Sequence, residues 1–401
     1  MGKSGYPGEG KVLKFTPQEF ERRQNKIRAG MQFRNMECLV VVDRDIIQYI
    51  SGAAGHTTAH KAATGSGVLI FPLVETPVLF VVSSFHAAMM QKESSIPVRG
   101  VSFRKGQPEG VRIRDYSAEI IDTIKELGIE KRTIGLASWR SVPAYLFEEI
   151  KRELPYADFI SASDLMMECR RTKSAEELEF VRRAAECADA GIQALVETAR
   201  PGVTEAELVA ACDYAMVKAG SDRGSMLLLG AGPFEEMQGA ITEVTKSRRK
   251  LKEGDIILNE LSPIFEGYTA QVCVPISIGG QIPQSFKDRM NVDKALYELA
   301  LNELRQGNRY GEIDKKVFEA AEKLVPGFYK RAWALQPHEI DPALDRITLE
   351  ELRPGTVWVN HPWTVPASGK GYEGHTIGNT VIVTEDEPEV TSRWPCEIVV
   401  I

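Results

Sequence analysis

The first part of the chain alternates between short apolar runs and stretches with apolar residues at helical spacing. The segment 36–50 (MECLVVVDRDIIQYI) predicts two strands around a polar turn, and the runs 67–71 and 77–82 predict two more. Helical patterns lie between and after these runs, at 17–32, 116–127 and 144–154. Strands that alternate with helices favour an α/β domain with a buried, mostly parallel sheet, and we expect this domain to end near Ala162.

The pattern changes after this point, because two helix-start signals precede long helical stretches. Ser174 and Glu177 form a capping box, in which each side chain bonds the free backbone amide of the other residue, and Thr204 and Glu207 repeat it. Further elements follow in order: strands at 226–229, 256–261 and 268–274, helices at 288–306 and 310–324, and a strand-rich tail from 355 to 383. This order fits two helix pairs over a curved antiparallel sheet. With 401 residues the chain exceeds one core, so we expect two domains, 1–162 and 163–401.

Composition and charge narrow the classes of partner. The chain is 43% hydrophobic and 26% charged, as is typical of globular proteins, and its net charge of -7 argues against a nucleic-acid partner. The start of the chain (MGKSGYPGEGK) has no apolar run of the kind that a secretion signal requires, and no later segment approaches the length of a membrane span, so we expect a cytoplasmic protein with no membrane partner. The six cysteines lack zinc-type spacing and are expected to be reduced thiols.

Several motifs in a fixed order resemble the creatinase/prolidase/aminopeptidase P family. They are 169–178 (CRRTKSAEEL), 201–205 (PGVTE), 251–257 (LKEGDII), 352–357 (LRPGTV) and 379–386 (NTVIVTED), with a looser match at 15–24 (FTPQEFERRQ). The resemblance implies an α/β N-terminal domain, residues 1–162, and an α+β pita-bread C-terminal domain, residues 163–401. It also implies a homodimer in which the N-terminal domain of one subunit lies near the active site of the other.

Metal-dependent members of this family hold two divalent cations with two Asp, one His and two Glu. The resemblance places these positions on Glu260, Gln271, Arg331, His361 and Gly378. Such a set lacks the negative charge that two cations need, so we expect no dinuclear centre and no other cofactor. The alternative is a single transition metal on His361, Glu260 and either His338 or His375.

The replaced positions supply the first candidates for chemistry. Imidazole titrates near neutral pH, which suits His361 to general-base catalysis. Glu260 is expected to act as an acid/base with a raised pKa or to orient His361. Gln271 and Arg331 would orient the substrate, the latter as a fork for a carboxylate, and Cys273 is a candidate nucleophile. For each residue, a purely structural role is the alternative.

The remaining candidates follow from their place in the resemblance. His338 and Glu339 are expected in the wall of the pocket, and Glu373 and His375 on a loop near its opening. A loop rich in Gly, Ala and Thr carries three further candidates for closing over an anion, namely His56, His60 and Lys61.

These residues predict a metal-independent hydrolase that cleaves a C–N bond in a small, anionic amide, amidine or cyclic substrate, as creatinase does. Two alternatives stay open. One is a catalytically inactive pita-bread module that binds a peptide or protein, and the other is a lyase on the same scaffold. The sequence names neither the substrate nor the bond.

Overall fold

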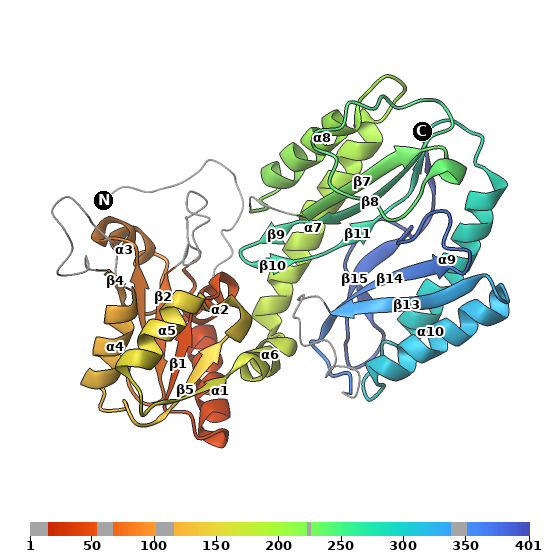
Figure 1. Ribbon diagram of the computed structural model, residues 1–401. Coiled ribbons are helices and arrows are strands. Elements are labelled where there is room, and N and C mark those ends of the chain that lie inside the picture. The colour runs from red at the N-terminus through yellow and green to blue at the C-terminus, as the bar shows by residue number, and fades with distance from the viewer. Residues whose placement is uncertain (1–14, 54–66, 102–115, 223–225, 338–350) are drawn as a thin grey trace. The chain divides into compact units, whose positions relative to one another are not determined.

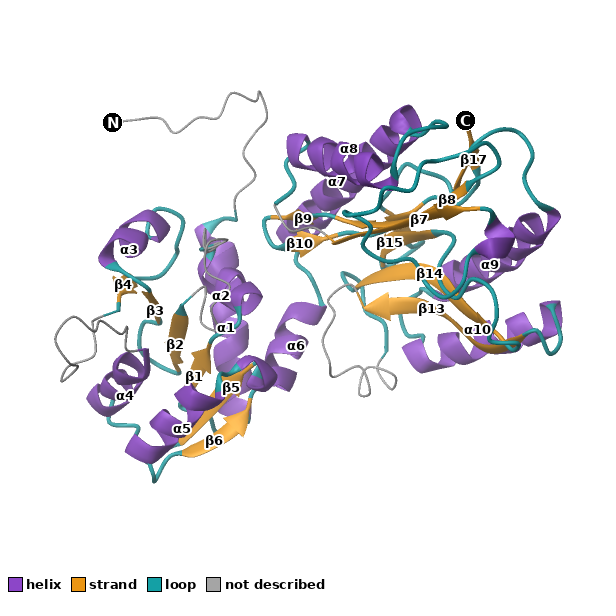
Figure 2. Ribbon diagram, turned by 45° about the horizontal axis from the view of Figure 1, so that its top comes forward, coloured by secondary structure: helices purple, strands orange, loops and turns teal. Residues whose placement is uncertain are grey.

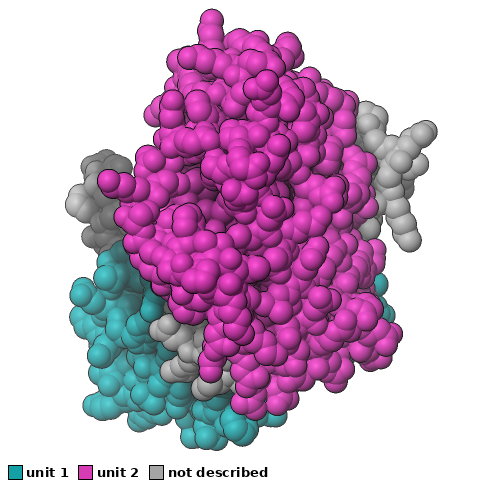
Figure 3. Space-filling model, turned by 90° about the vertical axis from the view of Figure 1, so that its right-hand side faces the viewer, with its two compact units in different colours: residues 1–169 teal, residues 170–401 magenta. Residues whose placement is uncertain are grey.

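The computed structural model describes residues 15–53, 67–101, 116–222, 226–337 and 351–401 (Figure 1). The chain divides into two compact units, residues 1–169 and 170–401, which Figure 3 shows in different colours. The division falls later than Ala162 because helix α6 (Ser163–Arg171) packs Leu165 and Met166 into the core of the first unit. None of the described helices is both long and apolar enough to cross a membrane.

The first unit is an α/β domain built on a mixed six-stranded sheet in the order β4-β3-β2-β1-β5-β6. Strands β1, β5 and β6 are parallel, as are β3 and β4, whereas β2 runs antiparallel to β1 and β3. The expected mostly parallel sheet is therefore mixed. Its elements are α1 (Pro17–Phe33), β1 (Cys38–Val41), α2 (Arg44–Ser51), β2 (Val68–Pro72), β3 (Val78–Val81), α3 (Ser84–Met90), β4 (Val98–Gly100), α4 (Tyr116–Glu126), β5 (Thr133–Ala137), α5 (Ala144–Glu153), β6 (Asp158–Ser161) and α6.

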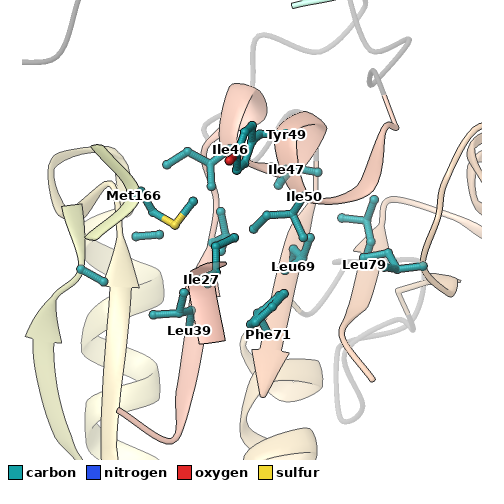
Figure 4. Packing of buried hydrophobic residues seen from close by; sticks show 14 of the residues in the cluster. Ile27, Leu39, Ile46, Ile47, Tyr49, Ile50, Leu69, Phe71, Leu79 and Met166 are labelled. Atoms are coloured by element: carbon teal, nitrogen blue, oxygen red, sulfur yellow. The ribbon is translucent and has the colours of Figure 1, made fainter. Parts of the chain in front are cut away.

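The central strands of this sheet are buried on both faces. In β1, Leu39 and Val41 pack with α1 and α2, whereas Cys38 and Val40 pack with α4 and α5. Figure 4 shows the first of these two clusters. Because successive side chains of a strand point to opposite faces, a strand covered on both sides must be apolar throughout, as the sequence is.

One predicted strand in this unit is wrong. The second half of 36–50 forms helix α2, because Asp43 caps it by accepting hydrogen bonds from the backbone amides of Asp45 and Ile46. The cap supplies partners for free helix amides, and the helix buries residues 46–51, its four apolar residues among them.

The second unit is a sheet that is antiparallel except for the parallel pair β12 and β17, with two helix pairs, α7 with α8 and α9 with α10 (Figure 2). Its main strands follow the order β13-β14-β15-β11-β8-β12-β17, with β7 beside β8 and β16 beside β15. The capping boxes at Ser174 and Thr204 are present at the starts of α7 and α8. The elements are α7 (Ala175–Thr198), α8 (Glu205–Lys218), β7 (Met226–Gly232), β8 (Ile256–Ser262), β9 (Ile264–Phe265), β10 (Tyr268–Thr269), β11 (Val272–Cys273), β12 (Ile276–Ser277), α9 (Gln284–Glu303), α10 (Tyr310–Leu324), β13 (Tyr329–Pro337), β14 (Val357–Pro366), β15 (Gly378–Ile382), β16 (Glu389–Val390) and β17 (Val399–Val400).

Candidate active site

Glu260 lies in the middle of the sheet, on the face directed away from α7 and α8. Its neighbours Ile257 and Leu261 in β8 pack against those helices, and strand alternation turns Glu260 the other way. The carboxyl is buried, with 7% of the residue exposed. Burial raises the pKa of Glu260 from 4.5 to about 7, although a hydrogen bond from Gln271 acts in the opposite direction. The group can therefore gain or lose a proton near neutral pH.

Gln271 meets Glu260 from the position just before β11, the strand next to β8. Its side-chain Nε2 donates to Glu260 Oε2 over 2.9 Å. Two hydrogen bonds to Thr380 fix the backbone of Gln271. The Gln271 N–H donates to Thr380 Oγ1, and the Gln271 carbonyl accepts from the Thr380 N–H. The carboxyl and the amide therefore form a held pair.

Two histidines complete the buried group. Asn360 donates to the backbone carbonyl of Tyr297 in α9, so His361, the next residue of β14, points to the opposite face. Its ring stacks on His375, with centroids 3.5 Å apart and planes 27° from parallel. His375 Nε2 in turn lies 3.6 Å from Glu260 Oε1.

Burial keeps both imidazoles uncharged. It lowers the pKa of His361 to about 3. It also lowers the pKa of His375 well below 6.5, and the neighbouring His361 adds to this effect. His361 therefore has little proton affinity at neutral pH, and the structure favours Glu260 over His361 as the group that exchanges a proton.

Gly378 makes room for His361. A Cβ atom at position 378 would lie 2.5 Å from the Cβ of His361, closer than two carbon atoms approach in proteins. The resemblance placed the two replaced glutamates at these positions, and the structure shows that they face each other. His361 thus fits in this place only because residue 378 is a glycine.

The segment that carries His375 is anchored to helix α9. Arg289 donates to the backbone carbonyls of Tyr372 and Gly374 and forms a buried ion pair with Asp293 at 2.8 Å. Thr376 Oγ1 also donates to Asp293. Sequence reasoning missed this pair, although opposite charges four residues apart on a buried helix face are a usable signal.

A row of stacked side chains leads away from the buried group. Trp363 contacts His375 edge to face with centroids 4.5 Å apart, and Trp333 stacks on Trp363. The guanidinium of Arg331 lies over Trp333, 4.7 Å from its centroid. Sequence reasoning missed both tryptophans, although Trp363 is two residues from His361 in a strand and so shares its face.

The structure brings together four of the predicted residues, Glu260, Gln271, His361 and His375. It corrects the place of His375, which is buried rather than near an opening. Arg331 is exposed and lies at the far end of the aromatic row, and Glu373 is half-buried with its backbone amide bonded to the Gly239 carbonyl.

Cys273 is fully buried in β11. Burial raises the pKa of its thiol well above 9, with the nearby Glu260 adding to the shift. A thiol of this kind stays protonated at neutral pH, so the proposed nucleophile role is not supported. The candidates His56, His60, Lys61, His338 and Glu339 lie outside the described residues.

The buried group does not have the donors of a two-cation site. It offers one carboxyl, one neutral amide and two imidazoles, whereas two hard divalent cations need several carboxylates. Among the described residues, no group of three or more His, Cys, Asp or Glu side chains could hold a metal ion.

Comparisons with known proteins identify the family. The model described as "Metallopeptidase family M24" matches residues 179–385, and "Creatinase/Prolidase N-terminal domain" matches residues 23–172. The chain belongs to metallopeptidase family M24. This M24 protein thus has the two parts that its motifs predicted, and the resemblance to the creatinase/prolidase family is confirmed.

Relatives with assigned names are peptidases. The chain is 27% identical to the probable dipeptidase PepE of Mycobacterium bovis, over 97% of this chain and 98% of that protein. It is 23% identical to the Xaa-Pro dipeptidase of Pyrococcus horikoshii, over 74% and 70%. Among solved structures, the X-Pro aminopeptidase of Thermotoga maritima matches with a TM-score of 0.75 at 20% identity, over 94% of this chain and 99% of that one, which establishes the fold.

These names correct the activity expected from the sequence. We predicted a metal-independent hydrolase of non-peptide C–N bonds, whereas the M24 relatives are named dipeptidases and the matching family is one of metallopeptidases. The prediction drew the metal-free chemistry from the replaced positions, and the small anionic substrate from the loop candidates His56, His60 and Lys61 and from the likeness to creatinase. The replaced positions describe which groups line the pocket, and they carry no information about which C–N bond enters it.

Proposed function

We propose that this M24 protein hydrolyses the peptide bond of short peptides. The names of its relatives support this class of substrate, because they act on dipeptides or on Xaa-Pro bonds according to those names. The observation that carries the proposal is the Glu260–Gln271 pair at 2.9 Å. It joins a proton-exchanging carboxyl to an amide donor in a buried setting.

The pair can serve both halves of a hydrolysis. Glu260, as carboxylate, takes a proton from a water molecule whose oxygen attacks the peptide carbonyl carbon. The amide group of Gln271 has two N–H donors, so one can hold Glu260 while the other donates to the carbonyl oxygen as it gains negative charge. Glu260 then returns the proton to the departing amine nitrogen, and the two products are a carboxylic acid and an amine.

The test is a panel of dipeptides and tripeptides, including Xaa-Pro peptides, with products separated and weighed by mass spectrometry. Each peptide is assayed without added metal and with manganese or cobalt, so that a shortage of metal cannot hide activity. We expect Glu260→Gln to lower kcat by about 10²- to 10⁴-fold, the usual contribution of a general acid/base. Glu243→Gln changes an exposed glutamate of the same unit and should have no effect.

Two results would contradict the proposal. One is the absence of cleavage of every peptide under every condition, and the other is full turnover by Glu260→Gln. The pH profile gives a further check: because Glu260 must be ionised to accept the proton, kcat/KM should fall as the pH drops below about 7. The homodimer and the cytoplasmic location also remain proposals, and light scattering of the purified protein tests the first.

A further inference from the structure

Several buried polar atoms around Glu260 have no hydrogen-bond partner among the described residues. They are both ring nitrogens of His361, Nδ1 of His375 and Oγ of Ser262. All three residues are more than nine-tenths buried. Ser262 is two residues from Glu260 in the same strand and therefore lies on the same face. Buried polar atoms are nearly always paired, so this set indicates a polar occupant.

The hydrogen-bonding character of these groups matches an amide. A neutral imidazole has one N–H donor and one acceptor nitrogen, and a hydroxyl can do both. A secondary amide likewise presents one N–H donor and one carbonyl acceptor. Together these side chains offer an acceptor for the N–H and a donor for the carbonyl of an amide that lies beside the bond to be cleaved.

The charge of the pocket does not match a free amino terminus. Glu260 is the one acidic side chain in the group formed with Gln271, Ser262, His361 and His375, and its Oε2 is already bonded to the neutral Gln271. Positions 271, 361 and 378, where the family resemblance places carboxylates, hold neutral side chains or none. A buried ammonium needs a close and well-bonded counter-charge, and this group offers no acidic side chain besides Glu260.

We propose that the pocket selects short peptides whose amino end is blocked as an amide, such as N-acyl dipeptides, over the same peptides with a free ammonium. This inference rests on the proposed function and names its substrate class. The neutral imidazoles and Ser262 bind the blocking amide, while Glu260 and Gln271 act on the peptide bond next to it.

The test compares each dipeptide in two forms, N-acetylated and free, with the same purified protein. We expect kcat/KM to be at least about ten-fold higher for the acetylated form. Calorimetry on the Glu260→Gln variant should likewise show tighter binding of the acetylated form than of the free form. Equal or better use of the free peptide would overturn the inference and leave the proposed function standing. Cleavage of neither form would instead overturn the proposed function.

Two variants make the comparison specific. Gln271→Glu restores a second carboxylate at nearly the same volume, so the affinity ratio should shift toward the free peptide by about ten-fold, whereas the exposed Gln284→Glu should leave the ratio unchanged. Ser262→Ala removes one partner of the blocking amide and should weaken binding of the acetylated form by about three- to ten-fold more than binding of the free form. An unchanged ratio in both variants would also overturn the inference.

Discussion

The ion pair between Arg289 and Asp293 gives a sharp stability prediction, because both side chains are almost completely buried. They are 6% and 0% exposed, and their closest atoms lie 2.8 Å apart. Arg289→Met removes the cation and leaves the carboxylate of Asp293 buried without its partner. Breaking a buried pair in this way costs about 3–5 kcal/mol in the free energy of unfolding.

The double variant Arg289→Met/Asp293→Leu separates the two contributions. It removes both charges, so the penalty for an unpaired buried carboxylate disappears. The carbonyls of Tyr372 and Gly374 lose their donor in both variants, at about 1–3 kcal/mol for each group left unpaired, whereas Thr376 loses its acceptor only in the double variant. We therefore expect the double variant to be less stable than the wild type but more stable than Arg289→Met.

Urea unfolding followed by tryptophan fluorescence measures the free energy of unfolding of the second unit, which contains Arg289 and Asp293. Four of the five tryptophans, all except Trp139, lie in the second unit. The exposed pair Arg309–Glu351 supplies the control, since Arg309→Met should leave the transition nearly unchanged. A loss below about 1 kcal/mol for Arg289→Met, or a double variant less stable than the single one, would refute the reasoning.

Three further predictions concern single residues. Gly378→Ala should destabilise the protein by about 1–3 kcal/mol in thermal or urea unfolding, because its Cβ would overlap His361, whereas Gly280→Ala, with open space around it, should not. The difference in free energy of unfolding between Glu260→Gln and the wild type should shift in favour of the variant by about 2–3 kcal/mol as the pH rises from 5 to 8. The reason is that the folded wild type holds the Glu260 proton more tightly than the unfolded chain does, so its stability falls as the pH rises toward 7; a constant difference would contradict this. Ser174→Ala should lower stability by about 1 kcal/mol, measured by urea unfolding, because it removes the cap of α7.

The fold could be read from the sequence where local chemistry and packing agree. The capping boxes at Ser174 and Thr204 set the starts of α7 and α8, and the apolar runs of β1 and β2 match their burial on both faces. The prediction failed at α2, where an apolar run of strand length follows a good cap. A short run of this kind fits a strand or a helix, and only the cap at Asp43 distinguishes them.

The site was predictable only in part, because its residues come from separate elements. Motif positions led to Glu260, Gln271 and His361, which the sheet brings together. No local pattern reports that His375 stacks on His361 or that Arg289 holds the segment carrying it. Such contacts follow from the curvature of the sheet and from where α9 lies on it, and neither is written in a short stretch of sequence.

The replaced positions are best understood as one coupled change rather than as separate losses. His361 fits only because Gly378 has no side chain, and its ring then packs against His375, which in turn lies beside Glu260. Gln271 holds the remaining carboxyl by a hydrogen bond instead of repelling it as a second carboxylate would. Independent drift at four positions would be expected to leave a buried charge without a partner. The described residues instead form an uncharged pair of stacked imidazoles beside a hydrogen-bonded carboxyl, and this neutral setting suits an amide better than an ammonium.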